Sequence, residues 1–146
     1  MNELSTEYFE HKLDELDNDD KALSQYLNEI NYKSFGKYFY ELMEAKKLSV
    51  KDIYIKCTNI SESYIYAIRN DEKSPTRDVV ITVACAMGIT VEETNTLLKY
   101  AGHRKLYAKD KDDALIIYCL NKKMDTSSIE ELLRSKNSHY RLFRDE

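Results

Sequence analysis

The chain has 146 residues, of which 42% are hydrophobic and 33% charged, a balance that fits one compact domain with or without an appendage and excludes a disordered tail. Three glycines and one proline are too few for the turns of a many-stranded sandwich or barrel, so we predict an all-α fold. The longest apolar run, Ala114–Leu120, has seven residues. A bilayer span needs roughly 20, so no membrane segment is predicted.

The net charge of −4 is unevenly distributed along the chain. Residues 1–32 hold two lysines and nine acidic residues, for a net charge of −7, whereas residues 33–78 carry +2 and residues 79–146 carry +1. Within the first segment, apolar residues recur at the helical spacing i, i+3, i+4 and i+7, as Leu23, Tyr26, Leu27 and Ile30. We therefore predict an acidic helical segment over residues 1–32. It is either a solvated helix surface or a docking site for a protein partner.

The cysteines and the N-terminus bear on the compartment. Cys57, Cys85 and Cys119 form no CxxC pair, which favours buried thiols in a reducing compartment over a zinc site. We predict no metal and no cofactor. The first four residues, Met1-Asn-Glu-Leu4, lack the basic and apolar regions of a secretory signal, so the predicted location is cytoplasmic.

A strong helical pattern follows the acidic segment and predicts a helix over Ser34–Lys47. Five apolar residues recur at i, i+3, i+4, i+7 and i+8, as Phe35, Tyr38, Phe39, Leu42 and Met43. The two lysines at the end of this range, Lys46 and Lys47, suit a helix C-terminus.

Two short helices are predicted next. Ser49 is the N-cap of the first, Asp52 is its capping-box partner, and the helix runs to about Cys57. Ser61 is the N-cap of the second, which runs to about Asn70. A connection of about four residues between such helices is typical of a helix-turn-helix motif.

The second of these helices has an apolar rear face with Ile65 and Ile68. Its front face is formed by Glu62, Ser63, Tyr66, Ala67 and Arg69. A helix enters the major groove of DNA, about 12 Å wide, when its front is free of bulky apolar side chains, and polar groups near its N-terminus then read the base edges. The predicted base-facing residues are Ser61, Glu62, Ser63 and Tyr66.

Two further helices are delimited by their caps. Thr76 caps the first, which ends at Gly88. Thr90 and Glu93 form the capping box of the second, which ends at Gly102. Residues 35–102 thus contain five predicted helices.

The motifs of this region occur in a characteristic order, as Leu48-Ser49, Ile60-Ser-Glu-Ser-Tyr-Ile65, Ser74-Pro75 and Val83-Ala-Cys-Ala-Met-Gly-Ile89. Residues 35–102 resemble the Cro/repressor-like DNA-binding domains of the XRE family. The resemblance implies a five-helix helix-turn-helix domain at residues 33–102 that binds double-stranded DNA. It also implies phosphate contacts from Ser49, Lys51, Lys73, Ser74, Thr76 and Arg77.

The sequence departs from the family pattern at three points. Ser49 and Ser61 are twelve residues apart where eleven is the common spacing, which implies one extra residue in the turn. Glu62 stands where a basic or amide residue is commoner, and Ala67 stands where a polar residue is usual. Few positively charged side chains are therefore expected to face the major groove.

Residues 103–146 predict a C-terminal helical extension. Asp110 caps a helix over the apolar run, and Ser127 with Glu130 forms the capping box of another. The apolar residues of these helices need partners, which are either the rest of the chain or a second subunit. We favour a homodimer, because two-fold pairing on a palindrome doubles the DNA contacts. Its predicted interface consists of Ile116, Ile117, Leu120, Leu132 and Leu133.

Two functions remain after enzymes are set aside for want of a glycine-rich phosphate loop or a GxSxG motif. The first is a sequence-specific DNA-binding transcriptional regulator, predicted to be a repressor, that reads DNA with Ser61–Asn70. The second is a protein-interaction module that keeps the helix-turn-helix fold without binding DNA. Convergence of the predicted phosphate contacts on the side of Ser63 would favour the first.

Overall fold

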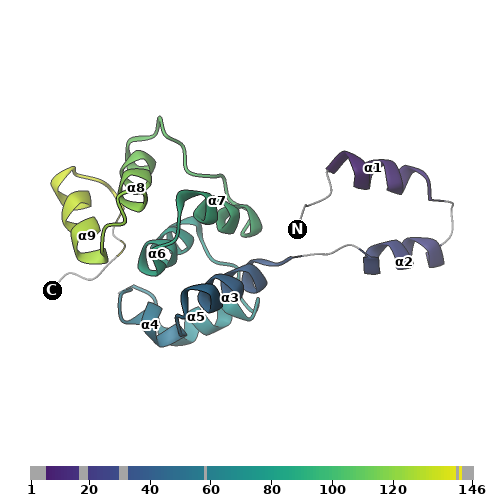
Figure 1. Cartoon of the computed structure of the whole chain (residues 1–146), viewed down its shortest axis with the longest axis horizontal. Helices are drawn as coiled ribbons and strands as arrows, with labels where there is room; N and C mark the ends of the chain where they lie inside the picture. Colours follow the sequence, from purple (N-terminus) through teal and green to yellow (C-terminus); the bar gives the residue numbers. More distant parts are fainter. Residues whose placement is uncertain (1–5, 17–19, 30–32, 58, 141, 143–146) are drawn as a thin grey trace. The chain divides into compact units, whose positions relative to one another are not determined.

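The computed structural model of the chain describes residues 6–16, 20–29, 33–57, 59–140 and 142. Over these residues the secondary structure consists of nine α-helices without a strand, which confirms the all-α class (Figure 1). None of the described helices is long and apolar enough to cross a membrane. The chain divides into two compact units, Met1–Tyr32 and Lys33–Glu146.

The first unit contains α1 (Thr6–Asp14) and α2 (Asp20–Glu29). Several of its apolar side chains are exposed, namely Tyr8, Leu13, Leu23 and Leu27. Ile30, the last residue of the predicted apolar stripe, lies outside the described residues. A protein partner for this acidic unit stays a prediction.

The second unit begins with five helices, in the order α3 (Phe35–Lys46), α4 (Val50–Tyr54), α5 (Glu62–Arg69), α6 (Arg77–Met87) and α7 (Val91–Tyr100). The predicted N-caps are confirmed, because the side chains of Ser49, Ser61, Thr76 and Thr90 each accept a hydrogen bond from the backbone N–H three residues later. The two capping boxes predicted among these five helices, with Asp52 and Glu93 as partners, are also present.

The first short helix ends earlier than predicted. α4 stops at Tyr54 rather than near Cys57, and seven residues separate it from α5. After Tyr54 the backbone bonds tighten to a 3₁₀-like pattern, since the N–H of Lys56 donates to Ile53 and the N–H of Cys57 donates to Tyr54. Cys57 is buried, which anchors the longer connection to the core.

α6 is the central helix of the second unit. Every residue from Val80 to Met87 is buried, as expected of a helix that is apolar on all sides. The core around α6 also receives the inward residues of α5, Ile65 and Ile68, neither of which retains any exposed surface. This packing holds α5 by its rear face and leaves its other face outward.

The start of α3 and the end of α5 are fastened together. The carboxylate of Asp71 accepts hydrogen bonds from the Ser34 hydroxyl at 2.5 Å and from the Gly36 N–H at 2.8 Å. A Cβ at Gly36 would lie only 2.3 Å from the carbonyl oxygen of Arg69, so this close approach requires glycine. The position of α5 is therefore fixed at its C-terminal end as well as along its rear.

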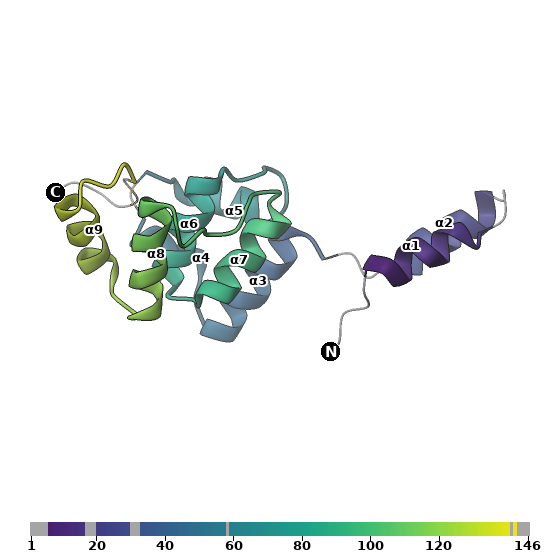
Figure 2. The ribbon, with the colours of Figure 1, turned by 90° about the horizontal axis from the view of Figure 1, so that it is seen from above.

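Two helices form the C-terminal extension, α8 (Lys111–Asn121) and α9 (Thr126–Ser135). α8 lies between α7 and α9 (Figures 1 and 2). Asp110 caps α8 as predicted. The capping box predicted for Ser127 and Glu130 is wrong.

The actual N-cap of α9 is Asp125, whose side chain accepts from the Ser128 N–H at 2.8 Å. The helix thus begins two residues earlier than the Ser127 cap would allow. Glu130 caps nothing and lies on the buried side of α9, where its Oε1 accepts from Arg134.

The residues predicted for a dimer interface belong to the core of one chain. Ile116 and Leu133 are fully buried and Leu120 is 6% exposed, while Ile117 and Leu132 are half-buried against the same core. Ile116, Leu120 and Leu133 are buried within the chain, so the predicted dimer interface is corrected at these three residues. Ile117 and Leu132 keep exposed surface, and their place in a dimer interface stays a prediction.

Candidate nucleic-acid interface

The outward face of α5 carries mostly polar groups. Ser63 and Tyr66 are exposed, and Glu62 is half-buried beside them. Ala67, which the sequence placed on this face, is buried. The chain after α5 folds back at this point, because the N–H groups of Glu72 and Lys73 both donate to the Ala67 carbonyl. The accessible ridge is therefore narrower than the helix spacing indicated.

Two of the predicted base-facing serines are partly engaged within the helix start. The Ser61 hydroxyl oxygen accepts from the Tyr64 N–H at 3.1 Å and lies 3.2 Å from the Ser63 hydroxyl oxygen. Ser63 is exposed and caps nothing, so it can turn its hydroxyl toward an incoming group. Ser61 contributes mainly to the start of α5, and Ser63 is the better placed of the two for recognition.

Two side chains that the predicted site left out, Arg69 and Tyr40, lie next to the predicted residue Tyr66. The guanidinium of Arg69 stacks 4.7 Å from the centroid of the Tyr66 ring and 5.9 Å from that of Tyr40, which comes from α3. Both rings are exposed. The spacing i, i+3 of Tyr66 and Arg69 is the sequence signal that indicates such a pair. It adds a cation and two aromatic faces to the front of α5.

Among the residues predicted to hold phosphates, Lys51, Lys73 and Ser74 are exposed. Neither lysine makes an ion pair with a described residue, and the Lys73 ammonium lies 5.7 Å from the centroid of the Tyr64 ring. Lysines that are not paired with carboxylates are available to an anionic partner. Lys73 comes four residues after the end of α5, and its N–H donates to the Ala67 carbonyl, which keeps it close to that helix.

The other predicted phosphate contacts act as helix caps. The Ser49 hydroxyl accepts from the Asp52 N–H at 3.1 Å, and the Asp52 carboxylate accepts from the Ser49 N–H at 2.9 Å. These bonds to Ser49 lower the pKa of the Asp52 carboxyl. The Thr76 hydroxyl accepts from the Val79 N–H at 3.3 Å. Ser49 and Thr76 are both exposed, so each hydroxyl retains its proton for a further hydrogen bond.

Arg77 differs from these residues because the chain itself uses all five of its N–H donors. Its Nε donates to the Arg104 carbonyl at 3.2 Å, and Nη2 donates to the Lys105 carbonyl at 3.2 Å and to Oδ2 of Asp113 at 2.8 Å. Nη1 donates to Oδ1 of Asp113 at 3.1 Å and to the Tyr140 hydroxyl at 3.0 Å. This geometry leaves no donor for the phosphate contact predicted from the sequence.

The Arg77–Asp113 pair is buried and electrostatically strong. The two side chains are 14% and 1% exposed. Burial by itself would raise the pKa of the Asp113 carboxyl, but hydrogen bonds from Arg77, Tyr140 and the Tyr107 N–H hold it below its usual value. The pKa of Arg77 is raised, chiefly by its hydrogen bonds to Asp113. Burial, with Asp113 alongside, also raises the pKa of the Tyr140 hydroxyl.

No sequence signal identified this network, because its members come from four separate segments. Asp113 is 36 residues from Arg77, and Tyr140 is 63 residues away. The network fastens α8 and the chain after α9 to the start of α6. The C-terminal extension is thus joined to the five-helix region by buried polar bonds as well as by apolar packing.

Comparison of the chain with family models, curated proteins and solved structures finds no match. The assignment of a function therefore rests on the site itself.

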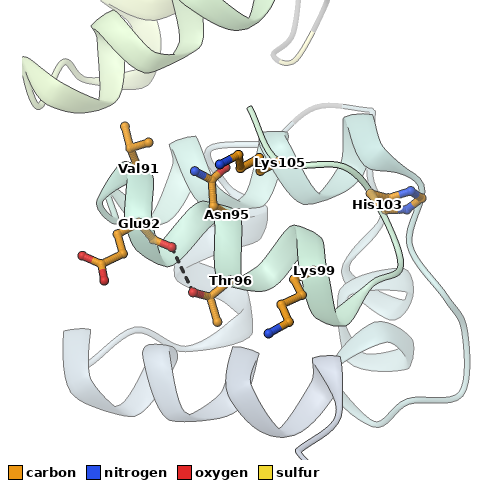
Figure 3. A pocket seen from close by; sticks show the side chains of 7 residues that line it. All are labelled: Val91, Glu92, Asn95, Thr96, Lys99, His103 and Lys105. Atoms are coloured by element: carbon orange, nitrogen blue, oxygen red, sulfur yellow. Dashed lines mark hydrogen bonds between the residues drawn. The ribbon is translucent and has the colours of Figure 1, made fainter. Parts of the chain in front are cut away.

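A shallow groove of about 750 Å³ lies on the outer side of α7 (Figure 3). Its lining consists of Val91, Glu92, Asn95, Thr96, Lys99, His103 and Lys105. Three of these residues are basic or imidazole side chains and one is acidic, so the groove has a mildly positive character. Among the described residues, no group of three or more His, Cys, Asp or Glu side chains could hold a metal ion.

Proposed function

We propose that the chain is a sequence-specific DNA-binding transcriptional regulator, a repressor, of the Cro/repressor-like helix-turn-helix type. In this proposal α3–α7 form the DNA-binding domain, α4 braces the motif and α5 enters the major groove. The observation that carries the proposal is the two-sided character of α5. Ile65 and Ile68 are fully buried behind it, while Ser63 and Tyr66 are exposed in front.

The chemistry of that front face suits base edges and phosphates. Ser63 can donate to or accept from a base edge, and Glu62 can accept from the amino group of cytosine. Arg69 and Lys73 carry charges that no described carboxylate neutralises, and Lys51 adds a third. The expected phosphate contacts are Ser49, Lys51, Lys73, Ser74 and Thr76, with Arg69 added. Arg77 is removed from this set because its donors are occupied.

Pairing of two copies on a palindrome remains part of the proposal, since it would double these contacts. The pairing surface excludes the buried side chains of Ile116, Leu120 and Leu133. Sedimentation of the protein with and without DNA measures this pairing. A monomer at tens of micromolar both free and on a palindromic site would contradict it.

The test of DNA binding is selection from a random-sequence duplex pool, followed by gel shift of the selected site over a range of salt concentrations. Ser63→Ala is expected to change the preferred sequence, because its hydroxyl reads a base edge. Lys73→Gln is expected to weaken binding to all sequences about equally and to reduce the salt slope by about 0.9, the value for one phosphate contact. Lys122→Gln, at the C-cap of α8, is the matched control and should leave both properties unchanged.

The alternative function is a protein-interaction module, and one observation favours it specifically. The exposed cluster of Tyr40, Tyr66 and Arg69 consists of the residue types that contribute most to protein–protein binding. A pool that yields no retained duplex at low salt would refute the proposed DNA binding. The alternative would then predict that Tyr66→Ala abolishes capture of a protein partner.

A further inference from the structure

A short basic segment follows α7 and lies against the residues that come after α5. We call residues 103–105, His103-Arg104-Lys105, the basic loop. His103 Nε2 is 2.8 Å from the Pro75 carbonyl oxygen. The basic loop therefore touches the segment between α5 and α6, to which Lys73, Ser74 and Thr76 belong.

The backbone of the basic loop is tightly held although it is neither helix nor strand. Gly102 has a positive φ of 81°, and the His103 N–H donates to the Leu98 carbonyl at 2.8 Å, which turns the chain at the end of α7. The Leu106 N–H donates to Oδ1 of Asn95 at 2.8 Å, and the Leu106 side chain is buried. Both ends of the basic loop are thus fixed to α7.

Arg77 fixes the middle of the basic loop. Its guanidinium donates to the carbonyls of Arg104 and Lys105, each at 3.2 Å, while Asp113 holds the same guanidinium from the opposite side. Two consecutive carbonyls that bond to one rigid planar group have little rotational freedom. The charge of Arg77 is neutralised by Asp113, but the cations that it positions are not neutralised.

The side chains of Arg104 and Lys105 are exposed, and neither makes an ion pair with a described residue. Lys105 reaches the groove beside Asn95, as Figure 3 shows. Two cations on a fixed backbone lose less conformational freedom on binding than two on a flexible tail. They are suited to an extended anionic partner that also contacts residues 73–76.

We propose that Arg104 and Lys105 contact the DNA phosphates that flank the base pairs read by α5, and that Arg77 is the positioning residue for both. This inference rests on the proposed DNA binding. Arg104 and Lys105 thus supply positive charge from outside the helix-turn-helix motif, in a loop of the C-terminal extension. The interaction is with backbone phosphates, so it adds affinity without changing the preferred sequence.

The main experiment is a salt titration of the double variant Arg104→Gln/Lys105→Gln on the selected duplex. Loss of two phosphate contacts should reduce the salt slope by about 1.8 and lower the affinity about tenfold per contact near 0.1 M salt. The loss should be the same on the selected and on a scrambled duplex. Lys122→Gln/Lys123→Gln, at the end of α8, removes the same charge and should leave the slope unchanged.

The role of Arg77 is tested with Arg77→Lys, which keeps the charge but cannot bond both carbonyls and the carboxylate together. The expected result is a lower salt slope than wild type, at a temperature where circular dichroism shows the variant folded. Adding Arg104→Gln/Lys105→Gln to Arg77→Lys should then lower the slope by clearly less than it does in the wild type. A purely structural role would reduce stability and leave the slope of the folded protein unchanged.

The outcomes separate the two proposals. Wild-type protein that binds DNA while Arg104→Gln/Lys105→Gln retains the wild-type slope would overturn the inference and leave the proposed function intact. Wild-type protein that retains no duplex from the pool would overturn the proposed function, and the inference with it.

Discussion

Replacement of Asp113 by asparagine is the sharpest test of how the C-terminal extension is attached. The Asp113 side chain is 1% exposed, and both oxygens of its carboxylate act only as hydrogen-bond acceptors. Oδ1 accepts from Arg77 and from the Tyr140 hydroxyl, and Oδ2 accepts from Arg77 and from the Tyr107 N–H. The asparagine side chain cannot reproduce this set, because either orientation of the amide places its NH₂ group against two donors.

The size of the effect follows from the burial of the pair. The change removes two charge-assisted hydrogen bonds and leaves the Arg77 cation without a counter-ion, a loss that costs about 3–5 kcal/mol for a buried pair. The melting temperature of a unit of this size should fall by about 4 °C per kcal/mol, and therefore by more than 10 °C. Asp78→Asn, in the exposed first turn of α6, is the matched control and should cost about 1 kcal/mol or less.

The assay is urea unfolding followed by far-ultraviolet circular dichroism at several pH values. The folded state holds the pKa of Asp113 below the usual 3.8, so its contribution is complete at neutral pH and is lost as the pH falls through the folded-state pKa, below 3.8. The difference between wild type and Asp113→Asn should therefore shrink in acid. A cost at pH 7 no greater than that of Asp78→Asn would refute the assignment of the network as a structural fastening.

Three further measurements test other parts of the structure. Gly36→Ala places a Cβ 2.3 Å from the Arg69 carbonyl oxygen and should lower the free energy of unfolding by about 3 kcal/mol or more. Gly102→Ala meets no heavy atom within 4 Å but has a positive φ, so it should cost about 1–2 kcal/mol. Equal costs in urea unfolding would contradict the close approach of α3 to α5. Ile116→Ala should cost about 2–5 kcal/mol at every protein concentration, because the side chain is buried within one chain. A cost that changed with protein concentration would place Ile116 in a subunit interface instead. Burial raises the pKa of the Cys57 thiol to about 12, so iodoacetamide at pH 8 should label it slowly in the folded protein and rapidly in urea. Mass spectrometry measures the labelling, and fast labelling of the folded protein would show that the thiol is accessible.

The candidate face of α5 was predicted in part. Its N-cap at Ser61 and the inward direction of Ile65 and Ile68 follow from spacing within one helix, so the sequence predicts them correctly. The burial of Ala67 was missed because alanine suits either environment. The turn that follows, in which the N–H groups of Glu72 and Lys73 donate to the Ala67 carbonyl, was not predicted either. The pair of Tyr66 and Arg69 was predictable from the i, i+3 spacing, but its third member Tyr40 comes from α3.

The sequence by itself determined the all-α class, most of the helix starts and the inward faces of the helices. Capping interactions join residues three apart, as between Thr90 and Glu93, and apolar periodicity is a property of a single helix, so neither depends on the rest of the fold. The tertiary structure alone decided the partners of Arg77 and of the apolar residues of α8. The contacts of Arg77 join segments 27 to 63 residues apart, and those of α8 join separate helices. A guanidinium or an isoleucine has the same local pattern whether its partner is a phosphate, a second subunit or its own chain.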